Sequence, residues 1–374
     1  MAATPHTPDV GPLPVALCAL AAALSSCGGG TSDAGVAEAL RVSGRTMGTS
    51  YSLIVVPPVG SALAASDLER VADSLLVAIN AEVSTYESDA LIGAFNRGDT
   101  VELPVVRAVA EPQRLPGAHL AANLALAREP YRVSGGAFDP TVGPLAEYYG
   151  FGAAAVDTSA VDEAEVARLR ELVGFDHVAT DTLAGGASLR VYPGRPGLRL
   201  DLSALAKGYA VDQVGLLLGE RFGLSDTFVE IGGETRTRGR SPRGTPWAVG
   251  INTPEEGASL DDLALVLELG DAAVATSGNY RNVRLRGGRR YVHTIDPRTG
   301  RARPSSLLSA TVVADDCATA DAYATACMAS GEAAGEVLAE AGLAGCLIFA
   351  GRAGRYDVRY VGAFAELVAD DARE

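Results

Sequence analysis

The sequence carries little positive charge and has no long internal hydrophobic run. Its 374 residues include 31 Lys and Arg against 46 Asp and Glu, which gives a formal net charge of −15. General nucleic-acid binding requires clusters of Lys and Arg that contact phosphates, so this composition argues against nucleic acid as a partner. No internal apolar run reaches the length of a bilayer-spanning helix, while the 48% of hydrophobic residues is enough to bury a large core.

Cysteine is scarce as well, and the five cysteines form no recognisable metal or redox motif. None lies in a C-x-x-C pair, so the sequence indicates neither a zinc site nor a thioredoxin-like centre. Cys317 and Cys327 are expected to be buried small side chains, and a disulfide between them is left open. The phosphate-binding sequence G-x-x-x-x-G-K-[ST] is also absent.

The N-terminal segment differs from the rest of the chain. Residues 13–24 (LPVALCALAAAL) form an apolar run of signal-peptide length, followed by Leu24-Ser-Ser-Cys27, which resembles a bacterial lipobox. Residues 1–11 depart from a typical signal peptide because they contain no Lys or Arg. We expect a lipoprotein signal peptide at 1–26, lipidation of Cys27 and a flexible tether at 27–40. The chain would then be exported and anchored at the periplasmic face of a bacterial membrane; the alternative is an alanine-rich leader without structure.

Residues 41–374 read as one α+β domain, because strand and helix patterns do not alternate strictly. Runs rich in β-branched residues or leucine predict strands, among them Thr49–Val56, Leu198–Leu202 and Leu308–Ala314. Apolar spacing or alanine content predicts helices, among them Ser66–Val83, Leu205–Leu218 and Cys317–Cys327. Ser66 or Asp67 is expected to cap the first of these helices.

The segment from Tyr291 to Met328 contains the clearest chemical pattern. Asp321 and Thr325 are four residues apart on the expected helix, so their side chains share one face. A carboxylate and a hydroxyl side by side suit Mg²⁺, which prefers oxygen ligands. Taken alone, the pair also fits an Asp and a Thr that only cap and solvate a helix end.

Glycine-rich turns recur beside acidic or aromatic side chains. The turn at Ser134–Pro144 would let backbone approach a ligand closely, although taken alone it is better explained as a tight structural turn. Asp201 precedes a helix with Lys207 near its first turns, an arrangement that can hold phosphate. Alternatively, Asp201 is an N-cap and Lys207 a solvated charge. Val229–Glu234 ends a strand in Gly-Gly beside two carboxylates, and Ala275–Tyr280 presents small hydrogen-bond donors in a turn.

In their order along the chain, these segments resemble the ApbE family, the FAD:protein FMN transferases. The matching segments, from about Arg41 to Phe349, are Thr46–Tyr51, Ser84–Tyr86, Gly136–Pro140, Asp201–Gly208, Glu230–Gly233, Ala275–Tyr280, His293–Gly300 and Ala320–Thr325. The resemblance implies a single two-lobed α+β domain with mixed sheets flanked by helices and an FAD cleft between the lobes. It also implies Mg²⁺-dependent transfer of the FMN moiety of FAD to a Ser or Thr hydroxyl of an acceptor protein, with release of AMP.

The resemblance further implies roles for single residues. The positions that match flavin-contacting residues are Met47, Tyr86, Ala137, Phe138 and Asp139. Further FAD-contacting positions fall on Asp201, Lys207 and Ile295. The Mg²⁺ ligands map onto Asp321, Thr325 and the position of Ala204, where only the main-chain carbonyl can serve. Asn279 stands where many members have Asp, and Ser203-Ala204 replaces a common Gly-Gly.

His293 and Asp321 are the candidate catalytic residues. His293 is one of four histidines and lies beside the Ile295-Asp-Pro turn. It can act as a base towards the acceptor hydroxyl, or it can hydrogen-bond the turn or the ligand without proton transfer.

The implied partner is an exported or membrane redox protein with a short Ser- or Thr-containing flavinylation motif. Two other functions stay open at this point. One is a Mg²⁺-dependent FAD pyrophosphatase that releases FMN and AMP. The other is an exported lipoprotein that binds FAD without chemistry.

Overall fold

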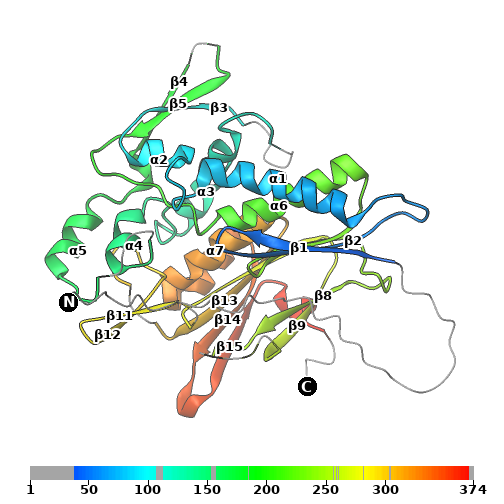
Figure 1. The fold of residues 1–374 in the computed structure, drawn as a ribbon. Helices are drawn as coiled ribbons and strands as arrows, with labels where there is room; N and C mark the ends of the chain where they lie inside the picture. Colours follow the sequence, from blue (N-terminus) through cyan, green and yellow to red (C-terminus); the bar gives the residue numbers. More distant parts are fainter. Residues whose placement is uncertain are drawn as a thin grey trace, which may run out of the picture.

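An antiparallel sheet lies at the centre of the fold. The computed structural model describes residues 38–106, 113–152, 157–183, 185–255, 257, 259, 261–280, 282–302 and 305–369. Within them, eight strands pair in the order β1-β2-β6-β7-β10-β13-β14-β15 (Figure 1). Their bounds are β1 Leu40–Thr46, β2 Thr49–Val56, β6 Asp226–Ile231, β7 Glu234–Arg238, β10 Ala272–Gly278, β13 Leu307–Ala314, β14 Ala344–Ala350 and β15 Tyr356–Val361.

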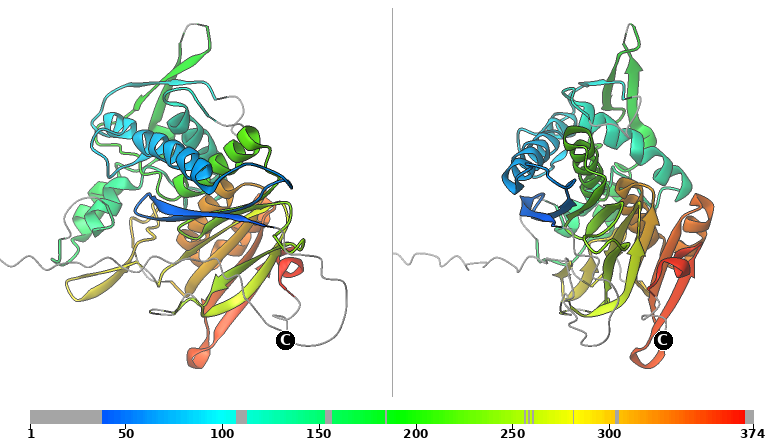
Figure 2. Two further views of the ribbon diagram at one scale, coloured as in Figure 1. Left: turned by 45° about the vertical axis from the view of Figure 1, so that its right-hand side comes forward. Right: turned by 90° about the vertical axis from the view of Figure 1, so that its right-hand side faces the viewer.

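Both faces of this sheet are covered. On β2, Leu53 and Val55 pack into the cluster shared with the helices, whereas Ile54 belongs to a second cluster on the opposite face. That second face is covered by a two-stranded sheet made of β8 (Trp247–Asn252) and β9 (Leu263–Leu269). The helices and the small sheet therefore lie on opposite sides of the central sheet (Figures 1 and 2). Alternation of side chains along a strand explains why neighbouring residues of β2 enter different clusters.

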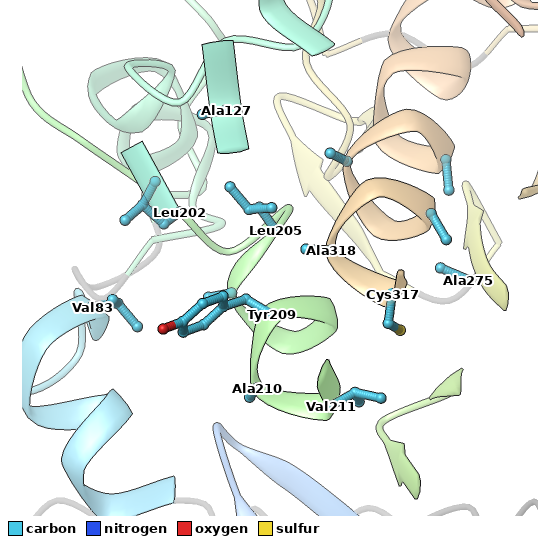
Figure 3. Packing of buried hydrophobic residues seen from close by; sticks show 14 of the residues in the cluster. Val83, Ala127, Leu202, Leu205, Tyr209, Ala210, Val211, Ala275, Cys317 and Ala318 are labelled. Atoms are coloured by element: carbon cyan, nitrogen blue, oxygen red, sulfur yellow. The ribbon is translucent and has the colours of Figure 1, made fainter. Parts of the chain in front are cut away.

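Three long helices and a shorter one pack on the first face and carry much of the site. They are α1 (Ala65–Val83), α3 (Ala118–Val133), α6 (Ala206–Phe222) and α7 (Cys317–Ser330). Figure 3 shows α6 between α1 and α7, with Val83 facing Tyr209. The helices α6 and α7 approach closely at Gly208, where an added Cβ would lie 2.3 Å from the carbonyl oxygen of Cys317. Glycine at this position allows the first turns of the two helices to lie side by side.

Smaller elements complete the domain. A three-stranded sheet has the order β3 (Val101–Pro104), β5 (Ser188–Pro193), β4 (Val178–Thr182), and a separate hairpin joins β11 (Val283–Arg286) to β12 (Arg289–Val292). The remaining helices are α2 (Leu91–Asn96), α4 (Gly143–Tyr149), α5 (Glu163–Arg170) and α8 (Ala334–Ala341). Short 3-10 turns lie at Phe175–His177, Gly331–Ala333, Arg352–Gly354 and Phe364–Leu367. No helix in the described part of the chain combines the length and apolar character needed to cross a bilayer.

The α+β prediction is confirmed, with some corrections. Every strand pair formed by the described residues is antiparallel, so the sheets are not mixed in direction. Leu198–Leu202 is not a strand, because the Asn96 side chain donates to the carbonyl of Leu200 and accepts from its N–H in place of a neighbouring strand.

Two further expectations change at the N-terminal side. The predicted cap of α1 is wrong in position: Ala64 is the N-cap, and Asp67 accepts a hydrogen bond from the Ala64 N–H (3.4 Å) from inside the first turn. The predicted tether at 27–40 overlaps β1, which already begins at Leu40. The predicted signal peptide at 1–26 and the lipidation site Cys27 lie outside the described residues.

Candidate functional site

A cavity of ≈ 390 Å³ lies where β10 and α7 face the α3–α4 connection. Residues predicted from separate segments of the sequence line it together: Tyr86, Ala137, Phe138, Asp139, Asp201, Ala204, Lys207, His293, Ile295, Asp321 and Thr325. A neighbouring hollow of ≈ 630 Å³ contains Met47 and shares Tyr86, Ser203 and Lys207 with the first. Because they share these residues, the two hollows form one cleft. A larger hollow of ≈ 730 Å³ beside α1 contains none of the predicted residues.

Lys207 stands at the centre of this cleft and is the only lysine in the sequence. Its Nζ lies 3.1 Å from Glu234 Oε1 and 3.8 Å from Asp321 Oδ2, and its side chain is 26% exposed. Burial lowers the pKa of Lys207, but the two carboxylates outweigh burial and hold that pKa above its usual value. The interpretation of Lys207 as a solvated charge is therefore wrong, because it is an ion-paired ammonium in the cleft.

Asp201 does not cap α6. The helix begins at Ala206 with Leu205 as its N-cap, and Asp201 instead accepts a hydrogen bond from the Ser203 N–H at 2.9 Å. This short turn of residues 201–203 forms part of the cavity wall. The chain reaches α6 through it, so Lys207 enters the cleft from the second residue of the helix.

The floor of the cleft has more carboxyl groups than ammonium groups. Glu234 and Asp321 face a single ammonium, and burial raises the pKa of both carboxyl groups. Glu234 Oε2 is buried without a hydrogen-bond partner, whereas Asp321 Oδ2 accepts from the Gly208 N–H at 3.1 Å. A buried carboxylate without full compensation favours a bound cation.

The oxygen atoms near Asp321 fit a hard divalent ion. Thr325 Oγ1 lies 3.3 Å from Ser277 Oγ, and both residues line the cavity together with Ala204. Within the described residues, no three His, Cys, Asp or Glu side chains form a metal-ligand group. A cation at this place would depend on Asp321, the Thr325 hydroxyl and main-chain oxygen, a set that suits Mg²⁺ better than zinc.

The turn after α3 presents its backbone rather than its carboxylate. Asp139 is 7% exposed, and its side chain accepts hydrogen bonds from Thr141 and from the Phe175 N–H. Burial raises the pKa of Asp139 to about 6. The Phe138 N–H is held by Ser134 Oγ at 2.9 Å. These bonds fix the turn and occupy the Asp139 carboxylate. Ala137, Phe138 and Asp139 can therefore contact a ligand through their main-chain atoms.

Tyr86 and His293 lie on the same wall of the cavity. Tyr86 is 67% exposed and its hydroxyl is 3.4 Å from the Phe151 carbonyl, so it is a rim residue and not a core tyrosine. The His293 ring meets Phe151 edge-on at 6.4 Å, and its Nδ1 is buried without a partner. Burial lowers the pKa of His293, which leaves the imidazole neutral near pH 7 with one nitrogen available.

Met47 is held in an unusual backbone conformation. It occupies the first position of the two-residue turn between β1 and β2, with φ +48°, the one positive φ of a non-glycine residue among those described. A left-handed conformation costs an ordinary L-residue about 1 kcal/mol. The strain is consistent with a side chain placed for contact in the cleft rather than for turn stability.

Some functional positions were not singled out from the sequence. Glu234 was noted only as one of two carboxylates beside Gly-Gly, yet it is the closer ion-pair partner of Lys207. Ala275–Gly278, expected in a turn, forms the end of β10 and brings Ser277 to Thr325. The composition did hold one signal: every other basic Lys/Arg position in the chain is an arginine, and the single lysine, Lys207, lies in the site.

Comparison with known proteins agrees with this geometry. The model of the ApbE family matches residues 47–348. An FAD:protein FMN transferase of Vibrio cholerae is 36% identical over 310 residues, covering 82% of this chain and 85% of that protein. One of Haemophilus influenzae is 33% identical over 296 residues, covering 79% and 82%.

Solved structures are similar over most of the chain. The flavinyl transferase ApbE of Pseudomonas stutzeri superposes with a TM-score of 0.74 at 29% identity, covering 88% of this chain and 96% of that one. The flavin transferase ApbE of Vibrio cholerae gives 0.73 at 31% identity, covering 88% and 99%.

Proposed function

The chain belongs to the ApbE family, and we propose that its cleft transfers the FMN moiety of FAD to a Ser or Thr hydroxyl of an acceptor protein. It is an FAD:protein FMN transferase, as its relatives are named. The observation that carries the chemistry is the cluster of Lys207, Glu234 and Asp321 at the floor of a cleft made of two adjoining hollows.

The reaction is a phosphoryl transfer. The acceptor oxygen forms a bond to the FMN-side phosphorus, the bond from that phosphorus to the bridging oxygen breaks, and AMP leaves with the bridging oxygen. Such reactions depend mainly on positioning and charge neutralisation. His293 lines the cavity and burial lowers its pKa, so its neutral imidazole is in the protonation state in which it can accept the proton of the attacking hydroxyl.

The remaining residues position FAD. Lys207 supplies a compact positive charge to the pyrophosphate, and Met47 and Tyr86 contact the flavin at the outer end of the cleft. A Mg²⁺ ion held by Asp321, Thr325 and the Ala204 carbonyl would neutralise charge that develops on the pyrophosphate.

Product analysis tests the reaction. The chain is incubated with FAD, Mg²⁺ and an acceptor protein that carries a flavinylation motif, and the denatured acceptor is examined for flavin fluorescence while AMP and FMN are quantified. A fluorescent acceptor with matching AMP supports transfer. Free FMN and AMP without labelling indicate the pyrophosphatase, and intact FAD indicates binding alone.

Substitution of Asp321 tests the cation site. Asp321→Asn keeps an acceptor for the Gly208 N–H but removes the carboxylate, so we expect AMP release to fall by at least about 100-fold, since a bound metal contributes several kcal/mol. The control is Asp316→Asn, which changes the same charge at the N-cap of the same helix and keeps a capping side chain. Equal activities of both variants would remove the assignment of Asp321.

We also propose that the chain acts as an exported lipoprotein on an exported or membrane redox protein. The support is the apolar run at 13–24 followed by Leu24-Ser-Ser-Cys27. Radiolabelled fatty acid should enter the wild-type chain in bacterial cells and not the Cys27→Ser variant. Equal incorporation in both would place the lipid elsewhere.

A further inference from the structure

The β11–β12 hairpin is a basic projection in an acidic protein. Between Asp271 and Asp296 the sequence contains five arginines and no Asp or Glu, although the whole chain has a net charge of −15. Within the hairpin, Gly287 and Gly288 form a two-residue turn with φ +54° and +74°. Such a turn matches the twist of two antiparallel strands, so the projection has a defined shape.

Two arginines fasten the hairpin to the domain. Arg286 is 1% exposed, donates to the Ser159 carbonyl at 3.1 Å and pairs with Asp157 at 2.9 Å. Arg284 donates to the Gly150 carbonyl at 3.1 Å and lies over the Phe151 ring at 5.6 Å. A lone two-stranded hairpin is marginally stable, so these contacts supply its rigidity.

The tip of the hairpin is exposed, whereas Tyr291 and Val292 at its base are buried. Leu285 is 66% exposed and pairs in register with Arg290, which places both side chains on the same face. Arg289 at the turn is exposed as well. The surface therefore combines an apolar contact with guanidinium groups, a combination typical of protein-binding sites.

The base of the hairpin belongs to the cleft. Asn282 and His293 flank β11 and β12 and both line the ≈ 390 Å³ cavity. Their backbones are joined by the His293 N–H donating to the Asn282 carbonyl at 3.2 Å. A protein segment whose hydroxyl reaches His293 comes close to this wall, so the base of the hairpin borders the place of the reacting atoms.

We propose that the β11–β12 hairpin docks the acceptor protein by binding an acidic segment next to its target hydroxyl. The inference rests on the proposed transferase function and adds the chemistry of the partner. An acidic acceptor would be repelled by most of this chain, and a basic hairpin at the cleft would attract and orient it. A membrane surface with anionic lipids could also attract arginines, but it would not explain why the hairpin grows from the wall that carries His293.

The test compares two double variants of the full chain with equal changes in charge. Arg289→Glu with Arg290→Glu alters the hairpin. Arg352→Glu with Arg355→Glu alters exposed arginines at the β14–β15 turn, which contributes no residue to either hollow of the cleft. The substrates are FAD and an acceptor domain with Asp or Glu beside its modified hydroxyl, together with a copy in which those carboxylates are amides. Binding of FAD, followed by the change in flavin fluorescence, serves as the measure of an intact fold and cleft.

We expect the hairpin variant to raise KM for the acidic acceptor about tenfold with little change in kcat, as loss of rim charge pairs does. The control variant and the amide acceptor should change KM by less than about twofold. Added NaCl should raise the KM of the wild-type chain and affect the hairpin variant less. Binding of FAD should be unchanged.

Two results would overturn the inference alone. One is normal transfer with the same KM in wild type and hairpin variant. The other is an unchanged KM together with lost binding to phosphatidylglycerol vesicles, which would make the hairpin a membrane contact. If the wild-type chain consumes no FAD with either acceptor, the proposed function is wrong, and the inference that rests on it is wrong as well.

Discussion

Replacing Gly208 by alanine should force apart the two helices on which Lys207 and Asp321 stand. The added Cβ would lie 2.3 Å from the carbonyl oxygen of Cys317 and 2.9 Å from Cα of Ala318. These are backbone atoms, so no side-chain rotation relieves the overlap.

The start of α7 cannot shift freely either. The N–H groups of Cys317 and Ala318 both donate to the Asp212 carboxylate of α6 at 2.9 Å, and Asp212 pairs with Arg236 at 2.6 Å. The overlap therefore has to be absorbed by movement of whole helices, and the hydrogen bond from the Gly208 N–H to Asp321 is lost or lengthened with it.

Two opposing effects set the magnitude. Alanine is favoured over glycine inside a helix by about 0.5–1 kcal/mol, whereas overpacking a well-filled core costs about 1–3 kcal/mol. We expect a net loss of roughly 1–2 kcal/mol in the free energy of unfolding. Gly215→Ala in the same helix is the matched control, since its Cβ would meet Val229 Cγ2 at an ordinary 3.9 Å. That variant should gain about 0.5–1 kcal/mol.

Urea unfolding of the three proteins measures both differences, and AMP release reports the effect on the cleft. Gly208→Ala should unfold at lower urea than wild type and Gly215→Ala at higher urea. The reasoning is refuted if Gly208→Ala is as stable as Gly215→Ala, because helix preference alone would then account for both.

Three further substitutions give distinct results. Burial raises the pKa of Glu230 from 4.5 to about 7, so the folded state binds an extra proton between these values and the free energy of unfolding falls as pH rises through them. Glu230→Gln removes this loss, up to about 3 kcal/mol, and urea unfolding should show its advantage over wild type growing from pH 4.5 to pH 8. Met47→Asn relieves left-handed strain and should add about 1 kcal/mol to stability while weakening FAD binding, as followed by flavin fluorescence. Lys207→Arg should stay folded but release AMP on the order of tenfold more slowly, because a planar fork does not replace a compact ammonium between Glu234 and Asp321.

Each of these has a clear contrary outcome. Parallel pH profiles of wild type and Glu230→Gln would show that this carboxyl group titrates normally. Unchanged FAD affinity in Met47→Asn would separate the strained turn from ligand binding. Full activity of Lys207→Arg would reduce the role of Lys207 to that of any positive charge.

Segments with strong local patterns were predictable from the sequence. The run Thr49–Val56 is β2 without change, since β-branched residues dominate it and Pro57 ends it. The helix expected at Ser66–Val83 differs from α1 by one residue. In both, apolar spacing and the local stop signals agree with the tertiary structure.

Segments that depend on distant partners were not predictable. Leu198–Leu202 has the composition of a strand, but Asn96, distant in the sequence, occupies its backbone groups. The run Ala275–Tyr280 looks like a turn because its side chains are small and polar. It enters the sheet because Thr276 pairs with Thr311 of β13 in register and through their hydroxyls.

The candidate site shows the same division. The order of motifs along the chain identified the residues that line the cleft, and the i, i+4 pair of Asp321 and Thr325 was readable on a helix pattern. That Lys207 meets both Glu234 and Asp321 depends on the close approach of α6 and α7 at Gly208, which no local pattern encodes. The β11–β12 hairpin was not predicted, although Gly287-Gly288 between two short strands is a hairpin turn sequence.

The solitary ε-amino group of Lys207 makes the cleft directly observable in solution. Protein grown with ¹⁵Nζ-labelled lysine carries a single labelled ammonium, which lies between Glu234 and Asp321. Its single NMR resonance needs no assignment, and it reports the binding of a nucleotide or a cation at those carboxylates. Among the side chains, an amine-directed reagent can modify only Lys207. The rate of this modification therefore measures how far a bound nucleotide shields the floor of the cleft from solvent.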